Sequence, residues 1–234
     1  MNPETGLSED LERIYGRRFD SNESYRNLVW KTLIEDWFQK YVPLSAAVLD
    51  LGCGYGQFIN NIQCEQKYAM DLNPAVLGRL NPDVTVHRQN CTSKWDFDDD
   101  SLDVIFTSNF FEHLPSKDDL AKTIVEARRC LRSGGRLIAM GPNVKFVGGA
   151  YWDYFDHHIA LTDRSLVEAL ETAGFRIEYA RDRFLPYTMV DSRRYPTSMV
   201  RLYLRLPILW KVFGKQFLVI GAKQDQRSER ARSI

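Results

Sequence analysis

Apolar residues along this chain form short runs that alternate with stretches of helical periodicity. The runs that predict strands cover 46–52, 67–72, 84–89, 101–108 and 135–141. Helical patterns stand between them, after Gly56, after Pro74 and over 117–132. Parallel strands need crossover connections, which helices usually supply, so this strict alternation predicts βαβ units and a parallel sheet.

Helical periodicity also precedes the first strand. Residues 25–41 place large apolar side chains at helical spacing, and Pro43 stops this amphipathic helix. Gly134 and Gly135 are expected to stop the 117–132 helix before the fifth strand begins.

The last third of the chain continues the same alternation. A loop over 144–158 comes first, and Thr162 then stands where it can cap the next helix. Runs at 175–184 and 215–223 predict the last two strands.

Size and charge narrow the function classes. The chain has 234 residues, of which 44% are hydrophobic, enough to bury the core of one α/β domain. It carries 31 basic and 31 acidic residues, so it gives no polyanion-binding signal and no nucleic-acid partner is expected. The charges are unevenly divided, with 12 basic and 4 acidic residues after Ala180 against 19 and 27 up to it. The basic part predicts either an interaction surface or a solvated face with a basic tail.

Cysteine usage and hydropathy predict a cytoplasmic protein. Cys53, Cys64, Cys91 and Cys130 show no C-x-x-C spacing, and the N-terminus lacks the basic-then-apolar pattern of a signal peptide. The longest apolar stretch, 199–222, is interrupted by four basic residues, whereas a membrane-spanning helix needs roughly 20 predominantly apolar residues.

The first predicted strand ends in a glycine-rich turn, Asp50-Leu-Gly52-Cys-Gly54-Tyr-Gly56. Glycines at such a turn let the backbone approach a ligand and leave N–H groups free for a polar cofactor. Gln57 stands where the G-x-G-x-x-G fingerprint of nicotinamide dinucleotide sites has its third glycine, which disfavours that cofactor.

Asp71 ends the second predicted strand, nineteen residues after Gly52. A carboxylate at this place can accept both hydroxyls of a ribose, because it lies beside the crevice outside the carboxyl ends of the strands. The glycine turn and Asp71 together predict a site for a nucleoside-containing cofactor.

These residues resemble the class I S-adenosylmethionine-dependent methyltransferases. VLDLGCGYGQF, YAMDLNP, RQNCTSKWDFDDDSLDVIF and SNFFEHLP are similar to the first four motifs of that family, and RCLRSGGRLIAMGPN is similar to the segment that follows them. The resemblance covers 46–223. It implies an α/β fold with a doubly wound seven-stranded sheet of order 3-2-1-4-5-7-6, strand 7 antiparallel and helices on both faces.

The resemblance also implies which residues hold S-adenosyl-L-methionine and its product, S-adenosyl-L-homocysteine. The first motif contributes Asp50, Gly52, Cys53, Gly54 and Gly56. Asp71 takes the ribose hydroxyls, Leu72 packs on the adenine, and Asn109 meets the methionine end. Asn90 and Cys91 meet the adenine; the family usually has Asp at the first of these positions, and an Asn oxygen can also accept a hydrogen bond.

One domain over 1–234 accommodates all of these features. We expect a helical cap at 1–44, a Rossmann-like core formed by 45–184 and 215–223, an apolar-basic insertion at 185–214 and a tail at 224–234. In the cap, Tyr15 and Arg18 are candidates for covering the cofactor.

Histidines are the candidates for acid–base chemistry. Methyl transfer from a sulfonium needs mainly alignment, together with a base when the acceptor is a hydroxyl. Asp156, His157 and His158 lie on a loop that faces the cofactor pocket in related folds, and His113 follows the fourth strand. We hypothesise that Asp156 orients His157, which deprotonates the acceptor; the alternative is that the loop histidines shape the acceptor site and that His113 packs. His87 lies within a strand and is expected to be structural.

Absent motifs count against several acceptor classes. The segment after the fourth strand has no N-P-P-Y or D-P-P-Y, which is typical of methyltransferases acting on exocyclic adenine or glutamine nitrogens. A Pro-Cys nucleophile of the cytosine-C5 type is also missing. Four histidines without an ordered ligand cluster predict that there is no catalytic metal.

The insertion at 185–214 combines apolar and aromatic residues with basic ones. Its basic residues are Arg193, Arg194, Arg201, Arg205 and Lys211. This composition fits an amphipathic lid or a dimer-forming helix, or a surface that contacts an anionic lipid or a phosphate-bearing acceptor at the inner membrane face.

The insertion, the 151–158 loop and the last strand together resemble bacterial methyltransferases of surface polysaccharide or glycolipid assembly. The resemblance implies O-methylation of a sugar or another small hydroxyl acceptor. A quinone or aromatic acceptor is the alternative, and so is a non-catalytic cofactor-binding partner protein. The pattern does not indicate an oligomeric state.

Overall fold

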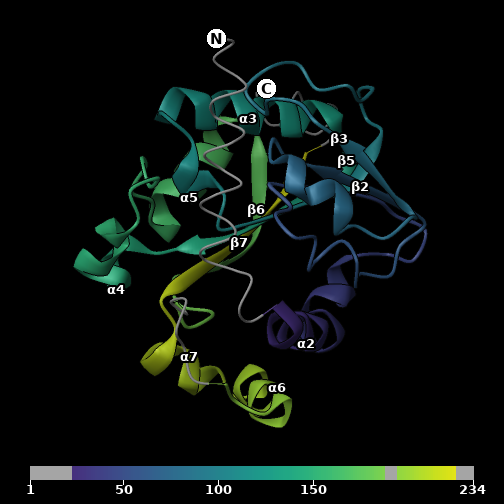
Figure 1. The fold of residues 1–234 in the computed structure, drawn as a ribbon. Coiled ribbons are helices and arrows are strands. Elements are labelled where there is room, and N and C mark those ends of the chain that lie inside the picture. The colour runs from purple at the N-terminus through teal and green to yellow at the C-terminus, as the bar shows by residue number, and fades with distance from the viewer. Residues whose placement is uncertain (1–22, 188–193, 225–234) are drawn as a thin grey trace.

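The computed structural model describes residues 23–187 and 194–224, and its centre is a seven-stranded sheet of order β3-β2-β1-β4-β5-β7-β6 (Figure 1). The strands are β1 (Ala47–Leu51), β2 (Gln66–Met70), β3 (Val84–His87), β4 (Leu102–Ser108), β5 (Leu131–Pro142), β6 (Phe175–Arg181) and β7 (Gln216–Lys223). The first five strands pair in parallel, and β7 runs antiparallel between β5 and β6. The predicted fold class and strand order are confirmed.

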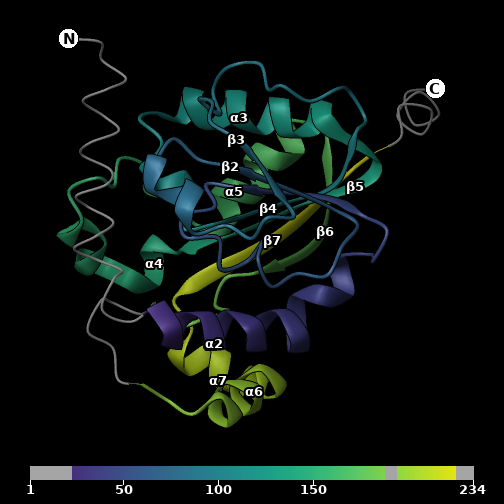
Figure 2. The ribbon, with the colours of Figure 1, turned by 45° about the vertical axis from the view of Figure 1, so that its right-hand side comes forward.

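Helices cover both faces of this sheet (Figure 2). One face carries α3 (Lys117–Cys130) and α5 (Asp163–Thr172). The other carries α2 (Glu23–Leu33), α6 (Thr197–Arg205) and α7 (Pro207–Phe213). Because side chains alternate along a strand, Leu49 and Leu51 of β1 join the core under α3 and α5, whereas Val48 joins the core under α2 and α6.

The main crossover helices begin where their capping residues predict. The Thr162 hydroxyl accepts the backbone N–H of Ser165, and the Ser165 hydroxyl accepts that of Thr162, so the two form a capping box for α5. Ser116 caps α3 by accepting the backbone N–H of Asp119.

The prediction of a helix after Gly56 is wrong, because the chain forms hydrogen-bonded turns there instead. The N–H of Asn60 donates to the carbonyl of Gly56, and that of Ile62 donates to Phe58, without a regular helix. The Asn60 side chain donates to the Arg79 carbonyl and accepts from the N–H of Asn81. These side-chain bonds tie the segment to the chain after β2 and compete with a helical continuation.

The predicted glycine stop after α3 is also wrong. The helix ends at Cys130, and β5 starts at once because the fully buried Leu131 pairs with Leu102 of β4. Gly134 and Gly135 lie inside β5, where the pairing register with β4 shifts. A Cβ on Gly135 would stand 2.9 Å from a backbone carbonyl, so glycine is needed for the close approach of the backbone.

Other boundaries differ in detail. The predicted 25–41 helix is α2 continued by a π-helical turn (Ile34–Phe38) and a 3₁₀ turn (Gln39–Tyr41). A further 3₁₀ turn follows β2 (Pro74–Gly78). The expected 144–158 loop contains α4 (Val144–Val147) and a 3₁₀ turn (Gly148–Asp153), so two thirds of it is helical.

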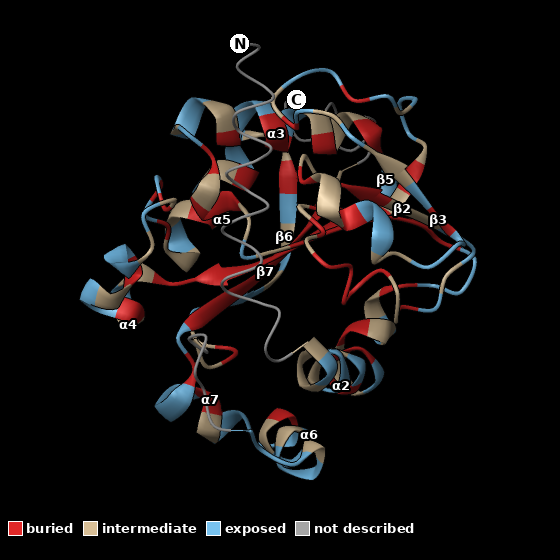
Figure 3. Cartoon of the chain, in the orientation of Figure 1, coloured by how far each residue is buried: buried red, intermediate tan, exposed pale blue. Residues whose placement is uncertain are grey.

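The 185–214 insertion packs beside α2. Arg201 of α6 forms an ion pair with Glu35 at 2.8 Å, and the Trp37 ring lies 5.1 Å from that of Trp210 on α7. Outward-facing residues of α6 and α7 are exposed, whereas the central strands are buried (Figure 3). Tyr15, Arg18 and Arg193 lie outside the described residues.

Within the two described ranges, no helix combines the length and apolar character needed to cross a membrane.

Candidate functional site

A cavity of about 1110 Å³ opens at the carboxyl ends of β1, β2 and β4. These ends lie together because Asp50 of β1 is in register with Ala69 of β2 and Phe106 of β4. Among the residues that the structure describes, every cofactor-binding and catalytic residue predicted from the sequence lines the cavity except Gly56. The sequence therefore located the walls of the site from residues that lie more than one hundred positions apart.

The glycine turn has a backbone that only glycine adopts readily. Gly52, Gly54 and Gly56 have φ of 68°, 52° and 72°. A Cβ on Gly52 would stand 2.3 Å from the Phe110 ring, and one on Gly56 would stand 2.2 Å from the Leu80 side chain. Gly52 and Gly54 line the cavity. Gly56 does not line it, and its role is to let the turn pass close to Leu80.

Asp71 joins the glycine turn to the end of β2. Its Oδ2 accepts the backbone N–H of Gly54 at 2.9 Å, and its Oδ1 accepts that of Asn73 at 2.9 Å. Burial raises the pKa of this carboxyl, although these backbone N–H groups pull it down. Each carboxylate oxygen has two lone pairs, so Asp71 can also accept hydrogen bonds from a ligand.

Asp50 is a buried acid beneath the turn. It is 3% exposed, and burial raises the pKa of its carboxyl to about 8, with the nearby Asp71 adding to the shift. Asp50 is therefore mostly protonated at neutral pH, and a cation bound beside it would favour its charged form. Burial also raises the pKa of the Cys53 thiol, which excludes this thiol as a reactive thiolate.

The residues expected to meet adenine are held by local hydrogen bonds. The side-chain oxygen of Asn90 accepts both the backbone N–H and the hydroxyl of Thr92, each at 2.9 Å. Its two lone pairs are thus already used, and its amide NH₂ is the group left for a ligand. The Cys91 carbonyl accepts the indole N–H of the buried Trp95 at 2.8 Å, which fixes the backbone of this segment.

Asn109 marks the end of β4 with a left-handed backbone, φ 50°. Its N–H donates to the Met140 carbonyl at 2.9 Å, so the chain turns sharply here into the short 3₁₀ turn Phe111–His113. This turn presents Glu112 and His113 to the cavity.

The structure pairs Asp156 with His113, a partner that the sequence did not suggest. Nδ1 of His113 lies 3.0 Å from the Asp156 carbonyl oxygen and 3.2 Å from its carboxylate Oδ2. Burial lowers the pKa of His113, but the Asp156 carboxylate and the charge of Glu112 outweigh it and raise the pKa above its ordinary value.

His157 and His158 point into different surroundings although they are adjacent. His157 is buried at 7% exposure, and its ring centroid lies 5.0 Å from that of His113 and 4.5 Å from that of Tyr151. The His158 side chain is exposed, and its backbone N–H donates to the Glu112 carbonyl at 2.8 Å.

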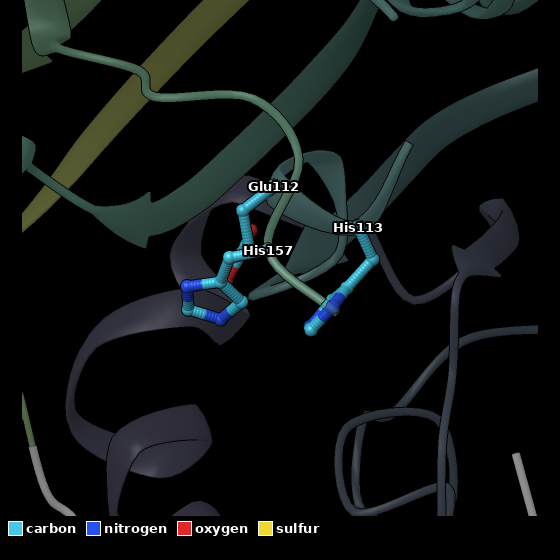
Figure 4. A group of neighbouring side chains, drawn as sticks. All are labelled: Glu112, His113 and His157. Carbon is cyan, nitrogen blue, oxygen red and sulfur yellow. The ribbon is translucent and has the colours of Figure 1, made fainter. Parts of the chain in front are cut away.

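Glu112 is the functional candidate that sequence reasoning missed. It is 3% exposed, and burial raises the pKa of its carboxyl. Its carboxylate lies with the rings of His113 and His157 in one group, in which one ligand atom from each residue lies within 4.8 Å of the others (Figure 4). The signal in the sequence was a lone acid inside the apolar segment NFFEHL. The premise that the chain has no ordered ligand cluster is therefore wrong.

Comparison with known proteins decides the family. The family model of a methyltransferase domain matches residues 23–180. The chain belongs to the class I S-adenosylmethionine-dependent methyltransferases. An uncharacterised protein of Methanocaldococcus jannaschii is 28% identical to this methyltransferase over 183 residues, which cover 74% of this chain and 76% of the relative.

Solved structures share the fold of this methyltransferase. A chain from the complex of the Haloferax volcanii Trm112 methyltransferase activator superposes with a TM-score of 0.64 at 15% identity, covering 96% of this chain and 99% of the other. An S-adenosylmethionine-dependent methyltransferase of Archaeoglobus fulgidus gives 0.63 at 18% identity, covering 86% and 97%. At these identities the likeness shows the fold alone.

The cavity of this methyltransferase fits the family cofactor. Asp71 presents its carboxylate at the end of β2, where a ribose is expected. The left-handed glycine turn brings backbone close to the cavity, and a side chain on Gly52 would collide with Phe110. S-adenosylmethionine carries a cationic sulfonium, which suits the acidic pair Asp50 and Asp71 in the same wall.

Proposed function

We propose that this methyltransferase transfers the methyl group to a hydroxyl oxygen of a small acceptor, a sugar or another hydroxyl compound. The observation that supports it is that the cofactor motifs and the Glu112–His113–His157 cluster line one cavity. Asn109, expected at the methionine end of the cofactor, comes three residues before Glu112. The polar cluster is thus close to the place from which the methyl group leaves.

The chemistry divides between cofactor and chain. When bound, S-adenosylmethionine supplies a methyl group on an activated, cationic sulfonium. A hydroxyl is a poor nucleophile at neutral pH, so the chain must align it and promote loss of its proton. We assign this task to Glu112, His113 and His157 as a unit, positioned by Asp156.

The size of the cavity supports a second ligand beside the cofactor. At about 1110 Å³ it exceeds the range of roughly 300–1,000 Å³ that single small-molecule sites occupy. Other walls come from the 154–158 loop, from residues 185–187 and from α6, including Tyr154, Tyr187 and Tyr203. An acceptor would lie between these aromatic side chains and the cluster.

We further propose that the acceptor is attached to a lipid or presented at a membrane surface. Exposed apolar side chains cluster on α6, on α7 and on the residue between them; they are Met199, Leu202, Leu206, Ile208, Val212 and Phe213. Arg205 and Lys211 are exposed on the same two helices. Apolar groups flanked by basic ones suit the interface of an anionic bilayer, and Met199, Leu202 and Phe213 also line the cavity.

The test uses methyl-labelled cofactor with separate acceptor pools. The purified protein is incubated with lipid-linked glycans, free glycans and small aromatic hydroxyl compounds, and the labelled products are identified by mass spectrometry. Label in a glycan as a methyl ether is the expected result. Label found only in an aromatic metabolite rejects the glycan acceptor, and tight cofactor binding without turnover on any pool favours a non-catalytic partner protein.

An aromatic hydroxyl acceptor is the second candidate. Phe58 and Phe106 stack at 3.7 Å, Trp30 meets Phe106 edge-on at 5.9 Å, and all three line the cavity. Such walls bind flat apolar rings well. The same labelling experiment separates the two candidates.

A further inference from the structure

Three side chains of metal-binding type converge on the cavity from two separate segments. Glu112 and His113 come from the 3₁₀ turn after β4, and His157 comes from the loop before α5 (Figure 4). One carboxylate oxygen and one nitrogen from each ring lie within 4.8 Å of one another.

We propose that Glu112, His113 and His157 bind one divalent transition-metal ion, and that the ion binds two neighbouring hydroxyl oxygens of the acceptor. This inference rests on the proposed O-methylation and narrows its acceptor to a vicinal diol. A sugar with adjacent hydroxyls and a catechol both present this chemistry.

The His113 ring is fixed in the way that is usual for a metal ligand. Metal-ligating histidines usually have their other ring nitrogen fixed by a carboxylate or a carbonyl. Nδ1 of His113 has both, the Asp156 carbonyl oxygen at 3.0 Å and its carboxylate oxygen at 3.2 Å, which leaves Nε2 for the ion. Asp156 is thus a positioning residue for His113.

The backbone holds the two segments together. The N–H groups of His158 and Ile159 both donate to the carbonyl of Glu112, at 2.8 Å and 3.2 Å. His157, directly before them, is thereby fastened beside the carboxylate. Two nitrogens on one ion at about 2.1 Å from it are at most about 4.2 Å apart. Because the ligand atoms all lie within 4.8 Å of one another, no pair exceeds this spacing by more than about 0.6 Å.

Two imidazoles and one carboxylate select the kind of ion. Magnesium and calcium prefer oxygen ligands, whereas imidazole suits zinc, iron, copper and nickel, and the carboxylate of the set also suits manganese. Three protein ligands leave coordination positions open, and the three side chains line the cavity, so these positions are accessible to a ligand there.

The ion would activate one hydroxyl of the diol. An oxygen bound to a divalent cation loses its proton more readily, and here the proton passes to solvent water. That oxygen forms the bond to the methyl carbon as the carbon–sulfur bond breaks, and the electron pair of that bond stays on sulfur. No oxidant or reductant is required.

Metal binding is tested on the full chain apart from catalysis. Chelator-treated protein is titrated with Mn²⁺ and with Zn²⁺ by calorimetry, and bound metal is counted by elemental analysis. We expect one ion per chain, at least 100-fold weaker binding in Glu112→Gln and His157→Ala, and 10- to 100-fold weaker binding in Asp156→Asn. His87→Gln, which changes a histidine of β3 away from the cavity, is the matched control and should bind the ion as the wild type does.

The outcomes separate this inference from the proposed function. Circular dichroism and cofactor binding show whether each variant is folded. Wild-type protein that binds neither ion, or ligand variants that bind like the wild type, overturns the metal site. Full methyl transfer to a hydroxyl in excess chelator also overturns it and leaves the proposed function standing. A bound ion in a protein that methylates only nitrogen acceptors rejects the O-methylation instead.

Mn²⁺ resonance spectra that change with a cis-diol sugar or with catechol, but not with the singly hydroxylated analogue, identify which diol is bound.

Discussion

The Asp156 carboxylate lies 3.2 Å from Nδ1 of His113, a residue 43 positions earlier in the chain. This contact joins the loop before α5 to the turn after β4, and it sets the orientation of an imidazole that lines the cavity. The proposed acceptor end is therefore assembled from two loop segments, whereas the residues expected to hold the cofactor lie at or just after the ends of β1, β2, β3 and β4. Each end makes separate predictions.

Gly52→Ala should destabilise the fold and weaken cofactor binding. The new Cβ would stand 2.3 Å from the Phe110 ring at a φ of 68°, and such strain costs about 1–3 kcal/mol. Thermal unfolding and calorimetry with S-adenosylmethionine measure the two effects. Gly78→Ala is the matched control, because a Cβ there meets nothing within 4 Å. Equal melting temperatures for both variants would contradict the account of the turn.

Asp71→Asn should weaken S-adenosylmethionine binding by about 10- to 100-fold, the loss expected when charge-assisted hydrogen bonds to a ligand become neutral ones. Calorimetry measures it. Asp83→Asn serves as the control, since Asp83 is exposed and pairs with Lys67 at 2.9 Å. Unchanged affinity for S-adenosylmethionine in the Asp71 variant would contradict the assignment of Asp71 to the ribose hydroxyls.

Asp50 should make the ligand-free protein less stable as pH rises. The pKa of its carboxyl is about 8 in the fold and about 3.9 in an unfolded chain. Between these values the folded state holds a proton that the unfolded state releases, so stability falls through this window and the loss is complete above about pH 8. Asp50→Asn should therefore gain melting temperature over the wild type at pH 8.5, and much less at pH 4.5, while binding the cationic cofactor more weakly. A difference in melting temperature that does not change with pH would contradict the assignment.

His157→Ala should slow single-turnover methyl transfer by roughly 100-fold or more, whereas His158→Ala should change it little. The reason is their burial: His157 lies against His113 and Tyr151, and the His158 side chain is exposed. Rapid-quench assays with labelled cofactor give the rates. If both variants transfer at the wild-type rate, the loop histidines take no part in the chemistry.

Charge reversal on α6 and α7 should abolish binding to anionic vesicles. The double variant Arg205→Glu, Lys211→Glu places acids among the exposed apolar side chains of the two helices. Co-sedimentation with phosphatidylglycerol vesicles, compared with neutral phosphatidylcholine vesicles, measures binding. Lys122→Glu is the control, because α3 lies on the opposite face of the sheet (Figure 2). Wild-type protein that does not sediment with anionic vesicles would reject the membrane contact.

Much of the fold followed from local sequence signals. Apolar runs that alternate with helical periodicity placed all seven strands. The signal is continuous at β1, β4 and β7, because these strands are buried on both faces of the sheet. The antiparallel position of β7 came from the family resemblance. Two predictions were wrong because other contacts compete with the local signal. The Asn60 side chain bonds to the segment after β2 of the same chain, where a helix was predicted. The buried Leu131 pairs with Leu102, so β5 begins before the glycines that were expected to end the helix.

The cofactor end of the site was predictable for a related reason. Asp50 and the glycines follow β1, and Asp71 follows β2. Parallel neighbours in a sheet bring their carboxyl ends together, so the order of elements along the chain was enough to group these residues.

The sequence by itself determined the strands, the glycine turn and Asp71, because each depends on residues close in the chain or on the regular geometry of a parallel sheet. Only the tertiary structure decided that Glu112 and His113 meet His157, and that Asp156 holds His113. These residues come from irregular segments 43 to 45 positions apart. Their meeting depends on hydrogen bonds such as those from His158 and Ile159 to the Glu112 carbonyl, which no periodicity records.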